Sequence, residues 1–427
     1  MKKLFERLIQ LKAKKTVEKF KPRVIAVTGS VGKTSTKKAI AEVLKTKFSV
    51  RVAEENYNNE FGVPFAILGV KSPGRSVLGW LKVLFKSEKE FPEILLLEYG
   101  ADRPGDISAL CDLVTPEVGV VTAITPVHVE NYGSDIEKLV AEKRVLVERL
   151  KADGLAILNG DDERVRGMAA KSKAQVLTYG TVSSDVWASD FSLEISENFS
   201  FKPGDTFATL RFHVRAKDQD FDVALKNALS RTQVSSALAA VAAGTHFGLA
   251  PEEMLKGLEN LLPEKGRVNP LPGIKGSLIL DDSYNAAPAS TLAALQVLSI
   301  FEPTEGRRRL AVLGDMGELG THSEAEHRSI GLQVAGAGFD LLCCVGEKAR
   351  DIARGALEAG MTQDQVREFA TSEDAGRHLD QEVKQGDIVL VKGSQSVRME
   401  KVVKDLMAEP LRAEELLVRQ YGKWLCS

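Results

Sequence analysis

The amino-acid sequence predicts an α/β fold with two main domains, each built on a parallel sheet covered by helices. Two observations lead to this prediction. Short apolar segments alternate with helical ones from Arg23 onward, and a Pro/Gly-rich stretch near Glu264, LPEKGRVNPLPG, interrupts the alternation. The chain has 427 residues, more than one hydrophobic core usually serves. We therefore expect an N-terminal helix over residues 1–22, a central domain over 23–264 and a C-terminal domain over 265–427.

The apolar segments give the expected strands. In the central domain they are Val24–Val27, Ile94–Leu97, Val118–Val121 and Ala156–Leu158. Between Val186 and Leu225 apolar and polar residues alternate, as is typical of antiparallel strands with one solvated face. The C-terminal domain returns to the first pattern, with expected strands at Ser277–Leu280, Leu310–Leu313, Leu341–Val345 and Asp387–Val391. Ligands of such sheets bind beyond the carboxyl ends of the strands, so polar residues there are the functional candidates.

The composition excludes several classes of protein. With 57 basic and 59 acidic residues the formal net charge is −2, which gives no general attraction to nucleic acid. No apolar stretch is long enough to predict a transmembrane segment. The four cysteines have neither metal-ligand nor disulfide spacing, which fits a reducing cytoplasm. We expect a soluble, cytoplasmic and monomeric protein.

The N-terminal segment, MKKLFERLIQLKAKKTVEKFKP, combines many lysines with Leu4, Ile9 and Leu11. This pattern favours a short packing helix with a solvated lysine face. The alternative is a basic amphipathic helix that makes a weak peripheral contact with an anionic membrane.

The segment VIAVTGSVGKTST predicts a phosphate-binding loop, because it runs from an apolar strand into the start of a helix. Gly29 and Gly32 let backbone N–H groups converge on a phosphate, and Lys33 can reach the outer phosphates. Thr34 offers a hydroxyl to Mg²⁺. The loop is shorter than the full G-x-x-x-x-G-K-[ST] pattern, because Val27 stands at the position of the first glycine.

Three further residues are candidates for a metal site near this loop. Glu98 directly follows an apolar strand, where its carboxylate can meet the ion bound by Thr34, and His128 follows another strand end. Lys143 falls within the apolar stripe of a predicted helix. The pattern alone favours a lysine at the edge of the stripe that extends to water. The alternative is a buried lysine, which needs a partner or a function.

The second domain carries four polar clusters: GRVNP, DDSYNAAP, LGDMGELG and VLVKGSQS. Arg267 can neutralise a phosphate, and Asp281 or Asp282 can accept hydrogen bonds from a ribose or an amine. Asp315, Glu318 and Lys392 follow the ends of two expected strands. A single cluster of this kind is more typical of a turn or a helix cap. Four of them at strand ends favour a binding site.

Taken in order, these segments resemble a known family. TGSVGKTSTK, NYNNEFGVP, LLEYGADRPGDI, PVHVENYGS, AEKR, LNGDDE, DDSYNAAPAS, VLGDMGELG and VLVKGS are similar to segments of the Mur ligases of the MurF type, from about Arg23 to about Leu406. The resemblance implies a P-loop central domain, a Rossmann-like C-terminal domain and an ATP-dependent ligase that works through an acyl-phosphate. The implied substrates are a UDP-N-acetylmuramoyl-tripeptide and D-alanyl-D-alanine.

The resemblance also implies roles for individual residues. ATP would be bound by Gly29, Ser30, Val31, Gly32, Lys33, Thr34, Ser35, Arg267 and Asp282. Two Mg²⁺ ions are implied, one bound by Thr34 and Glu98 and the other by His128 and a carbamylated Lys143. Catalytic roles fall on Lys33, Lys143, His128 and Arg267. Substrate contacts fall on Asn58, Asn59, Asn285, Asp315, Glu318 and Lys392.

The chain departs from the family pattern in three places. About twenty residues precede the phosphate strand, where this type of ligase has a domain that binds the UDP-sugar. Gln233 and Ser236 stand where asparagines are usual near the adenine, and Ala287 interrupts the run Y-N-A-N-P. Two other hypotheses therefore stay open: a related ligase acting on another amino-acid or polyglutamate-type substrate, and a non-catalytic nucleotide-binding switch or scaffold. Retention of Glu98, His128 and Lys143 together favours a ligase, since a simple switch does not need a second metal site.

Overall fold

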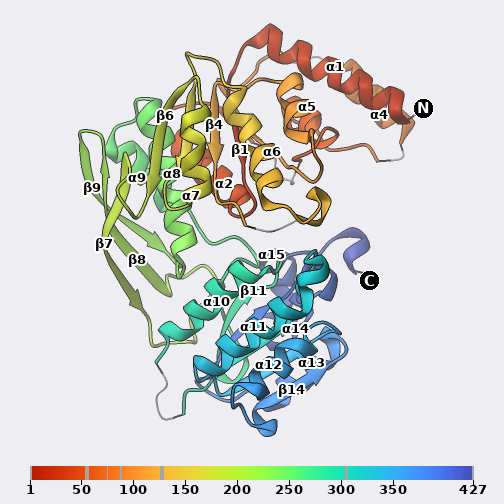
Figure 1. The fold of residues 1–427 in the computed structure, drawn as a ribbon, viewed down its shortest axis with the longest axis vertical. Helices are drawn as coiled ribbons and strands as arrows, with labels where there is room; N and C mark the ends of the chain where they lie inside the picture. Colours follow the sequence, from red (N-terminus) through yellow and green to blue (C-terminus); the bar gives the residue numbers. More distant parts are fainter. Residues whose placement is uncertain are drawn as a thin grey trace. The chain divides into compact units, whose positions relative to one another are not determined.

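The computed structural model describes residues 2–52, 57–74, 76–86, 89–125, 129–302 and 306–425. The chain divides into two compact units, which Figure 1 shows in ribbon form. Unit 1 comprises Met1–Ser192, Arg211–Ala224 and Arg231–Leu261, and unit 2 comprises Leu193–Leu210, Leu225–Ser230 and Leu262–Ser427. The last passage between the units, at Leu261, lies close to the boundary expected near Glu264. Two short segments of the strand-rich region belong to unit 2, which the sequence did not indicate.

A nine-stranded sheet begins in unit 1, with the order β2-β3-β1-β4-β5-β6-β7-β8-β9. Its strands are β1 (Arg23–Thr28), β2 (Val50–Val52), β3 (Ile94–Glu98), β4 (Val118–Val121), β5 (Leu155–Asn159), β6 (Gln175–Gly180), β7 (Val186–Ile195), β8 (Ala208–Ala216) and β9 (Gln219–Lys226). The neighbouring strands from β2 to β7 pair in parallel, which confirms the predicted fold class. β1, β3, β4 and β5 contain the four strands expected from the sequence.

The helices of unit 1 surround the parallel part of this sheet. They are α1 (Lys2–Phe20), α2 (Lys33–Leu44), α3 (Gly62–Leu68), α4 (Val77–Phe85), α5 (Asp106–Leu113), α6 (Ile136–Glu148), α7 (Glu163–Arg166), α8 (Arg231–His246) and α9 (Pro251–Glu259). The central strand β1 is buried and pairs with β3 on one side and β4 on the other. In this register Val27 lies opposite Glu98, and Thr28 lies opposite Val121. The sheet therefore brings the loop after β1 to Glu98.

Unit 2 contains a six-stranded sheet with the order β10-β11-β15-β12-β13-β14. The strands are β10 (Asn269–Pro272), β11 (Leu278–Asp282), β12 (Arg309–Gly314), β13 (Leu341–Val345), β14 (Val366–Phe369) and β15 (Ile388–Lys392). Its helices are α10 (Pro288–Ile300), α11 (Ser323–Gly336), α12 (Arg350–Glu358), α13 (Ser372–Glu382), α14 (Glu400–Leu406) and α15 (Ala413–Leu416). Only β10 is antiparallel to its neighbour; the other pairings are parallel.

Successive residues of the strands in unit 2 enter two different cores. On β12, Ala311 and Leu313 belong to one apolar cluster, whereas Leu310 and Val312 belong to the other. Both faces of the sheet are therefore covered, as the continuous apolar strands predicted. Phe199 and Phe207 belong to the first of these clusters. Burial of these aromatic rings explains why short segments around them are part of unit 2.

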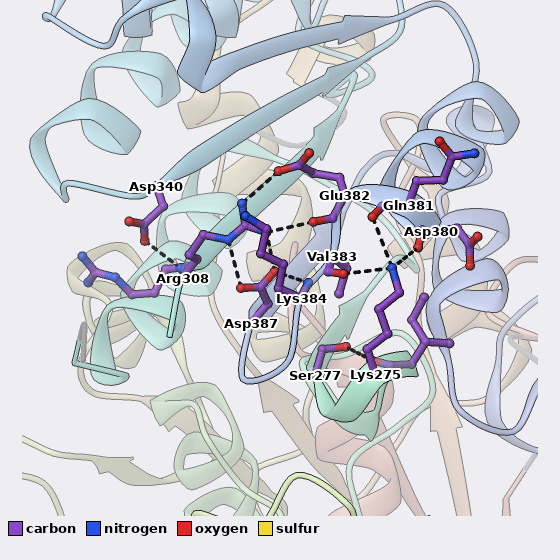
Figure 2. A network of polar contacts seen from close by, with 12 residues as sticks. Lys275, Ser277, Arg308, Asp340, Asp380, Gln381, Glu382, Val383, Lys384 and Asp387 are labelled. Carbon is purple, nitrogen blue, oxygen red and sulfur yellow. Dashed lines mark hydrogen bonds and ion pairs between the residues drawn. The ribbon is translucent and has the colours of Figure 1, made fainter. Parts of the chain in front are cut away.

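A polar network ties together the amino ends of the strands of unit 2, as Figure 2 shows. Arg308, just before β12, donates to both carboxylate oxygens of Asp387 at 3.1 and 2.7 Å and to Glu382 at 2.8 Å. Lys275, before β11, donates to the carbonyl oxygens of Asp380 and Val383 at the end of α13. Since ligands of such sheets bind at the carboxyl ends of strands, this network is structural.

Candidate nucleotide and metal site

The loop between β1 and α2 can be formed only with glycine at two positions. Gly29 and Gly32 have φ angles of 147° and 81°, which L-residues with a side chain rarely adopt. A Cβ atom on Gly29 would also lie 1.9 Å from Thr122 Oγ1. Ser30 N donates to the carbonyl oxygen of Ala123 at 2.7 Å, which holds the loop against the end of β4. The predicted phosphate loop therefore has a fixed backbone.

The groups in this loop fit a phosphate. Lys33 Nζ donates to the carbonyl oxygens of Gly29 and Ser30 at 2.9 and 3.1 Å, so its charge stays at the loop. Ser30 Oγ is buried and finds no hydrogen-bond partner among the described residues. The first N–H groups of the twelve-residue helix α2 point out of its N-terminus and favour an anion there. A phosphate oxygen would satisfy the buried Ser30 hydroxyl.

Glu98, the last residue of β3, lies next to the first turn of α2 and is only 3% exposed. Thr34 Oγ1 donates to Glu98 Oε2 at 3.2 Å, so the two predicted ligands of the first ion are adjacent. Burial acts to raise the pKa of Glu98, but the charges of Lys37 and Lys33, with hydrogen bonds from Lys37 and Asn58, hold that pKa below its usual value. A hydroxyl and an ionised carboxylate at this distance fit a Mg²⁺ ion, which prefers oxygen ligands.

Lys37 is a residue of this site that the sequence analysis missed. Its Nζ forms an ion pair with Glu98 Oε2 at 3.1 Å, and both side chains are buried. Lys37 follows Lys33 by four residues and so lies on the same face of α2. That spacing was the available signal, but a second lysine early in a helix is ordinarily solvated.

Lys143 is buried, with 3% of its surface exposed. The interpretation favoured by the pattern alone, a lysine at the edge of the stripe that reaches water, is therefore wrong. Burial and the nearby charge of Lys33 lower its pKa to about 7, although Asp102 and Glu142 act in the opposite direction. Its amine makes no hydrogen bond with any residue in the described ranges. The lowered pKa increases the fraction of this buried amine that is neutral and available for reaction.

Glu142, the neighbour of Lys143 in the chain, anchors α6 to α5. Its two carboxylate oxygens accept hydrogen bonds from Gly105 N and Ile107 N, both at 2.8 Å. These N–H groups belong to the first turn of α5, whose N-terminus favours a negative charge. The contact fixes the rotation of α6 and so keeps Lys143 on its buried face.

His128 lies outside the described residues, so its predicted place in the second metal site stays a prediction. No group of three or more His, Cys, Asp or Glu side chains suited to a metal ion occurs in the part of the chain that the structure describes. The two ligands described for the first ion are Thr34 and Glu98.

The asparagine pair before α3 divides between two roles. Asn58 Nδ2 donates to Glu98 Oε1 at 3.3 Å and its carbonyl oxygen accepts from Gly100 N, so Asn58 positions the carboxylate. Asn59 Oδ1 accepts from the N–H groups of Phe61 and Gly62 at 3.1 and 2.8 Å. Asn59 thereby caps the start of α3, and of the two side chains it is that of Asn58 that contacts Glu98.

In unit 2 the predicted residues Asp282, Asn285 and Lys392 come together. Lys392 Nζ lies 2.6 Å from Asp282 Oδ2 and 2.9 Å from the carbonyl oxygen of Asn285, and the ion pair is buried. The guanidinium of Arg267 lies 4.3 Å from the centre of the Tyr284 ring. The carboxyl ends of β11 and β15 therefore carry one polar cluster beside an arginine.

Asp315 and Glu318 lie beyond β12, and the structure gives Asp315 a structural partner. Asp315 Oδ1 accepts from Ala349 N at 2.8 Å, at the start of α12, while its carbonyl oxygen accepts from Ser394 N. Glu318 has a φ of 61°, in the left-handed region. The turn-and-cap interpretation of this cluster fits Asp315.

Two of the departures from the family pattern have structural partners. Ser236 Oγ on α8 lies 3.3 Å from Thr36 Oγ1 on α2, so it connects these two helices. Ala287 N donates a hydrogen bond to Ser290 Oγ at 3.1 Å, at the start of α10. Both positions lie beside elements that carry candidate residues.

The fold and the loop together define a nucleotide-dependent α/β enzyme with a phosphate loop at the end of β1. Residues 27–244 match the model of the Mur ligase middle domain, and residues 266–395 match that of the Mur ligase, glutamate ligase domain. The chain belongs to the Mur ligase family. It is an ATP-dependent ligase that forms C–N bonds and uses Mg²⁺.

Two relatives similar over most of the chain carry the same ligase name. The UDP-N-acetylmuramoyl-tripeptide–D-alanyl-D-alanine ligase of Bacillus subtilis is 32% identical over 405 residues, which are 94% of this chain and 80% of that protein. The enzyme of the same name from Escherichia coli is 29% identical over 389 residues, 90% of this chain and 76% of that protein. Both alignments cover the two units.

Solved structures agree with these relatives. MurF from Acinetobacter baumannii has a TM-score of 0.76 and 26% identity, with 93% of this chain and 79% of that chain covered. MurF ligase from Thermotoga maritima in complex with ADP has a TM-score of 0.75 and 26% identity, with 94% and 83% covered. The expected family and fold are confirmed.

Proposed function

We propose that this chain joins D-alanyl-D-alanine to UDP-N-acetylmuramoyl-tripeptide in the synthesis of a peptidoglycan precursor, with hydrolysis of ATP to ADP and phosphate. The observation that carries the proposal is the pairing of Thr34 with Glu98 at the phosphate loop, where the charge of Lys33 acts both on Glu98 and on the buried amine of Lys143. A nucleotide switch needs no such lysine. The relatives that align with most of the chain carry this activity in their names.

In this mechanism the phosphate loop holds the triphosphate while a substrate carboxylate attacks the γ-phosphorus. A carboxylate oxygen–phosphorus bond forms, and the bond from phosphorus to the ADP oxygen breaks. The amine of the dipeptide then attacks the acyl carbon, phosphate leaves and the amine loses a proton. Lys33 and the N-terminus of α2 stabilise the negative charge that gathers on the phosphoryl oxygens.

Mg²⁺ supplies further positive charge and orients the phosphates. For the first ion, Thr34 and Glu98 are the proposed ligands, and Lys37 keeps Glu98 ionised. Asn58 holds the other carboxylate oxygen in place. For a second ion we propose His128 and Lys143, the latter after its neutral amine adds to CO₂ to give a carbamate and a proton.

The residues of unit 2 are proposed to bind the remaining parts of the ligands. Arg267 and Asp282 would bind the nucleotide, through its phosphates and ribose. Asn285, Asp315, Glu318 and Lys392 are proposed to contact the substrates. In unit 1, Asn58 and Asn59 are proposed to do the same. The ion pair of Lys392 with Asp282 fixes both side chains, which favours binding without further ordering.

The test is phosphate release from ATP with each substrate alone and with both. We expect release only when UDP-N-acetylmuramoyl-tripeptide and D-alanyl-D-alanine are both present. Phosphate release with another pair of acid and amine would instead identify the chain as a related ligase with other substrates, such as one that extends polyglutamate. Release that needs neither substrate would contradict ligation.

The remaining expectations belong to the same proposal. We propose a monomer that acts in the cytoplasm and has no role in nucleic-acid binding, consistent with a formal net charge of −2. Within the described residues no helix combines the length and apolar character that a membrane span requires. A peripheral membrane contact through α1 is compatible with this finding.

A further inference from the structure

Helix α1 has one packed face and one exposed apolar stripe. Ile9 and Ala13 are fully buried in the core of unit 1. On another face, Leu4, Leu8 and Leu11 are 62%, 39% and 49% exposed. Their spacing of four and three residues places them on one side of the helix. The sequence predicted a packing helix with a solvated lysine face, but leucines occupy part of that solvated face.

Helix α4 exposes a second apolar stripe. Val77, Leu78, Leu81 and Phe85 are 53%, 79%, 38% and 83% exposed, whereas Trp80 is buried. The spacing of three and four residues again puts the exposed side chains on one side of the helix. Exposed leucines and a phenylalanine gathered on one short helix are unusual for a surface that contacts only water.

The two helices pack against each other. The rings of Phe5 and Trp80 lie 5.7 Å apart, and Lys12 Nζ donates to the carbonyl oxygens of Val83 and Leu84 at 2.7 and 2.9 Å. These contacts occur in the same order along both helices, so α1 and α4 run in the same direction. Figure 1 shows them next to each other near the N-terminus. We call the exposed residues of both helices the α1–α4 surface.

Basic side chains surround the apolar ones on this surface. Helix α1 contains seven basic and two acidic residues, although the whole chain has a formal net charge of −2. Its exposed cations are Arg7, Lys14, Lys15 and Lys19, and exposed lysines on or after α4 are Lys82, Lys86 and Lys89. Positive charge is therefore concentrated beside the exposed apolar stripes.

We propose that the α1–α4 surface docks the protein on a membrane that contains anionic phospholipid. The leucines and Phe85 would enter the headgroup region, and the lysines would lie at the level of the lipid phosphates. A second copy of the chain fits less well, because a two-fold interface would place these cations against the same cations of its partner. Docking on a membrane does not depend on the ligase reaction, so an experiment can contradict the docking without contradicting the proposed function.

The experiment is sedimentation of the full chain with vesicles of phosphatidylcholine, alone or mixed with phosphatidylglycerol. We expect binding to the mixed vesicles, about tenfold weaker binding to phosphatidylcholine alone, and weakening by salt. Leu78→Ser/Phe85→Ser and Lys14→Glu/Lys15→Glu should each weaken binding by about tenfold or more. Phosphate release without vesicles should stay unchanged in both variants.

Matched controls separate this surface from general stickiness. Leu411→Ser removes another exposed leucine, 99% exposed in unit 2, and Lys171→Glu/Lys173→Glu reverses two exposed lysines elsewhere in unit 1. These variants should bind vesicles as the unaltered chain does. Equal binding by all variants would overturn the proposal. So would a dimer in light scattering that Phe85→Ser dissociates, without any vesicle binding.

Discussion

At the scale of single residues, Lys37 and Glu98 show how the site combines stability with chemistry. Lys37→Met would leave a buried carboxylate without its ion-pair partner, at a cost of about 3 kcal/mol in the free energy of unfolding. Adding Glu98→Gln removes the buried charge and should restore most of this stability. The double variant should nevertheless lack ligase activity, because the proposed metal ligand is gone. Urea denaturation and phosphate release measure the two effects.

The adjacent lysine provides the control for this pair. Lys38 is half-buried on the same helix, and Lys38→Met should leave both stability and activity close to those of the unaltered chain. An active Lys37→Met/Glu98→Gln variant would remove Glu98 from the metal site. A single Lys37→Met variant without loss of stability would show that the ion pair contributes little.

Lys143 gives the second prediction at this scale. Lys143→Ala should lose nearly all ligase activity, since it removes the amine proposed to become a carbamate. Lys143→Glu places a carboxylate on the same buried face and should retain part of the activity. Phosphate release at saturating substrates measures both variants. Turnover by Lys143→Ala equal to that of the unaltered chain would exclude the carbamate.

Asp281 should make stability depend on pH. Burial, opposed by hydrogen bonds from Ser283 and Gly266, raises its pKa from 3.8 to about 6. Between these values the folded chain keeps a proton that the unfolded chain releases, so stability falls as pH rises and then levels off. Asp281→Asn has no proton to lose.

The stability of Asp281→Asn relative to the unaltered chain should therefore rise by up to about 3 kcal/mol between pH about 4 and about 6. Urea denaturation across this range measures the difference. A difference that does not change with pH would show that Asp281 titrates normally in the folded chain.

At the scale of elements, the sequence predicted what repeated patterns determine and missed what depends on packing. The continuous apolar strands, such as those that became β1 and β12, were found because both faces of each are buried. Strand β10 was interpreted as a linker because it contains Pro270 and Pro272. Proline lacks the N–H group that a central strand needs, but β10 is at an edge of its sheet, where proline is tolerated.

The helix α6 illustrates the same limit. Its apolar stripe was visible in the sequence, but the exact boundary of that stripe was not, so Lys143 was placed at the edge. The boundary is set by the contacts of Glu142 with the first turn of α5. The residues that make these contacts are separated by 37 and 35 positions in the chain. A pattern within one helix contains no information about such a contact.

The C-terminal segment after α15 leads to a prediction about the DDSYN loop of unit 2. Arg419 is 6% exposed and donates to the carbonyl oxygens of Ser283 and Tyr284 and to Glu400. It therefore holds the backbone between Asp282 and Asn285. Arg419→Ala should lower kcat and speed amide exchange over residues 283–286, measured by mass spectrometry.

A conservative variant tests whether Arg419 acts through position. Arg419→Lys keeps the charge but loses the fork of donors, so it should restore only part of kcat. Arg412→Lys, which alters a half-buried arginine paired with Glu415, is the control and should change neither measurement. Normal exchange over residues 283–286 in Arg419→Ala would contradict a positioning role.

At the scale of the whole molecule, the candidate groups are divided between the units. The phosphate loop, Glu98 and Lys143 belong to unit 1, whereas Arg267, Asp282 and Lys392 belong to unit 2. The strand-rich region passes between the units several times, because aromatic side chains around residues 199–207 join the core of unit 2. Sequence patterns located both sets of groups but not this exchange of short segments, which depends on distant packing.

Nucleotide binding should therefore change amide exchange separately in each unit. Addition of ATP and Mg²⁺ should stabilise the folded chain by about 2.7 kcal/mol at a concentration 100 times the Kd, because only the folded loop binds the triphosphate. Amide exchange should slow over residues 29–35. Lys33→Ala should abolish both effects, whereas Lys38→Met should preserve them. Slower exchange over residues 266–268 and 281–285 would support the nucleotide roles of Arg267 and Asp282, and unchanged exchange there would confine the nucleotide to unit 1.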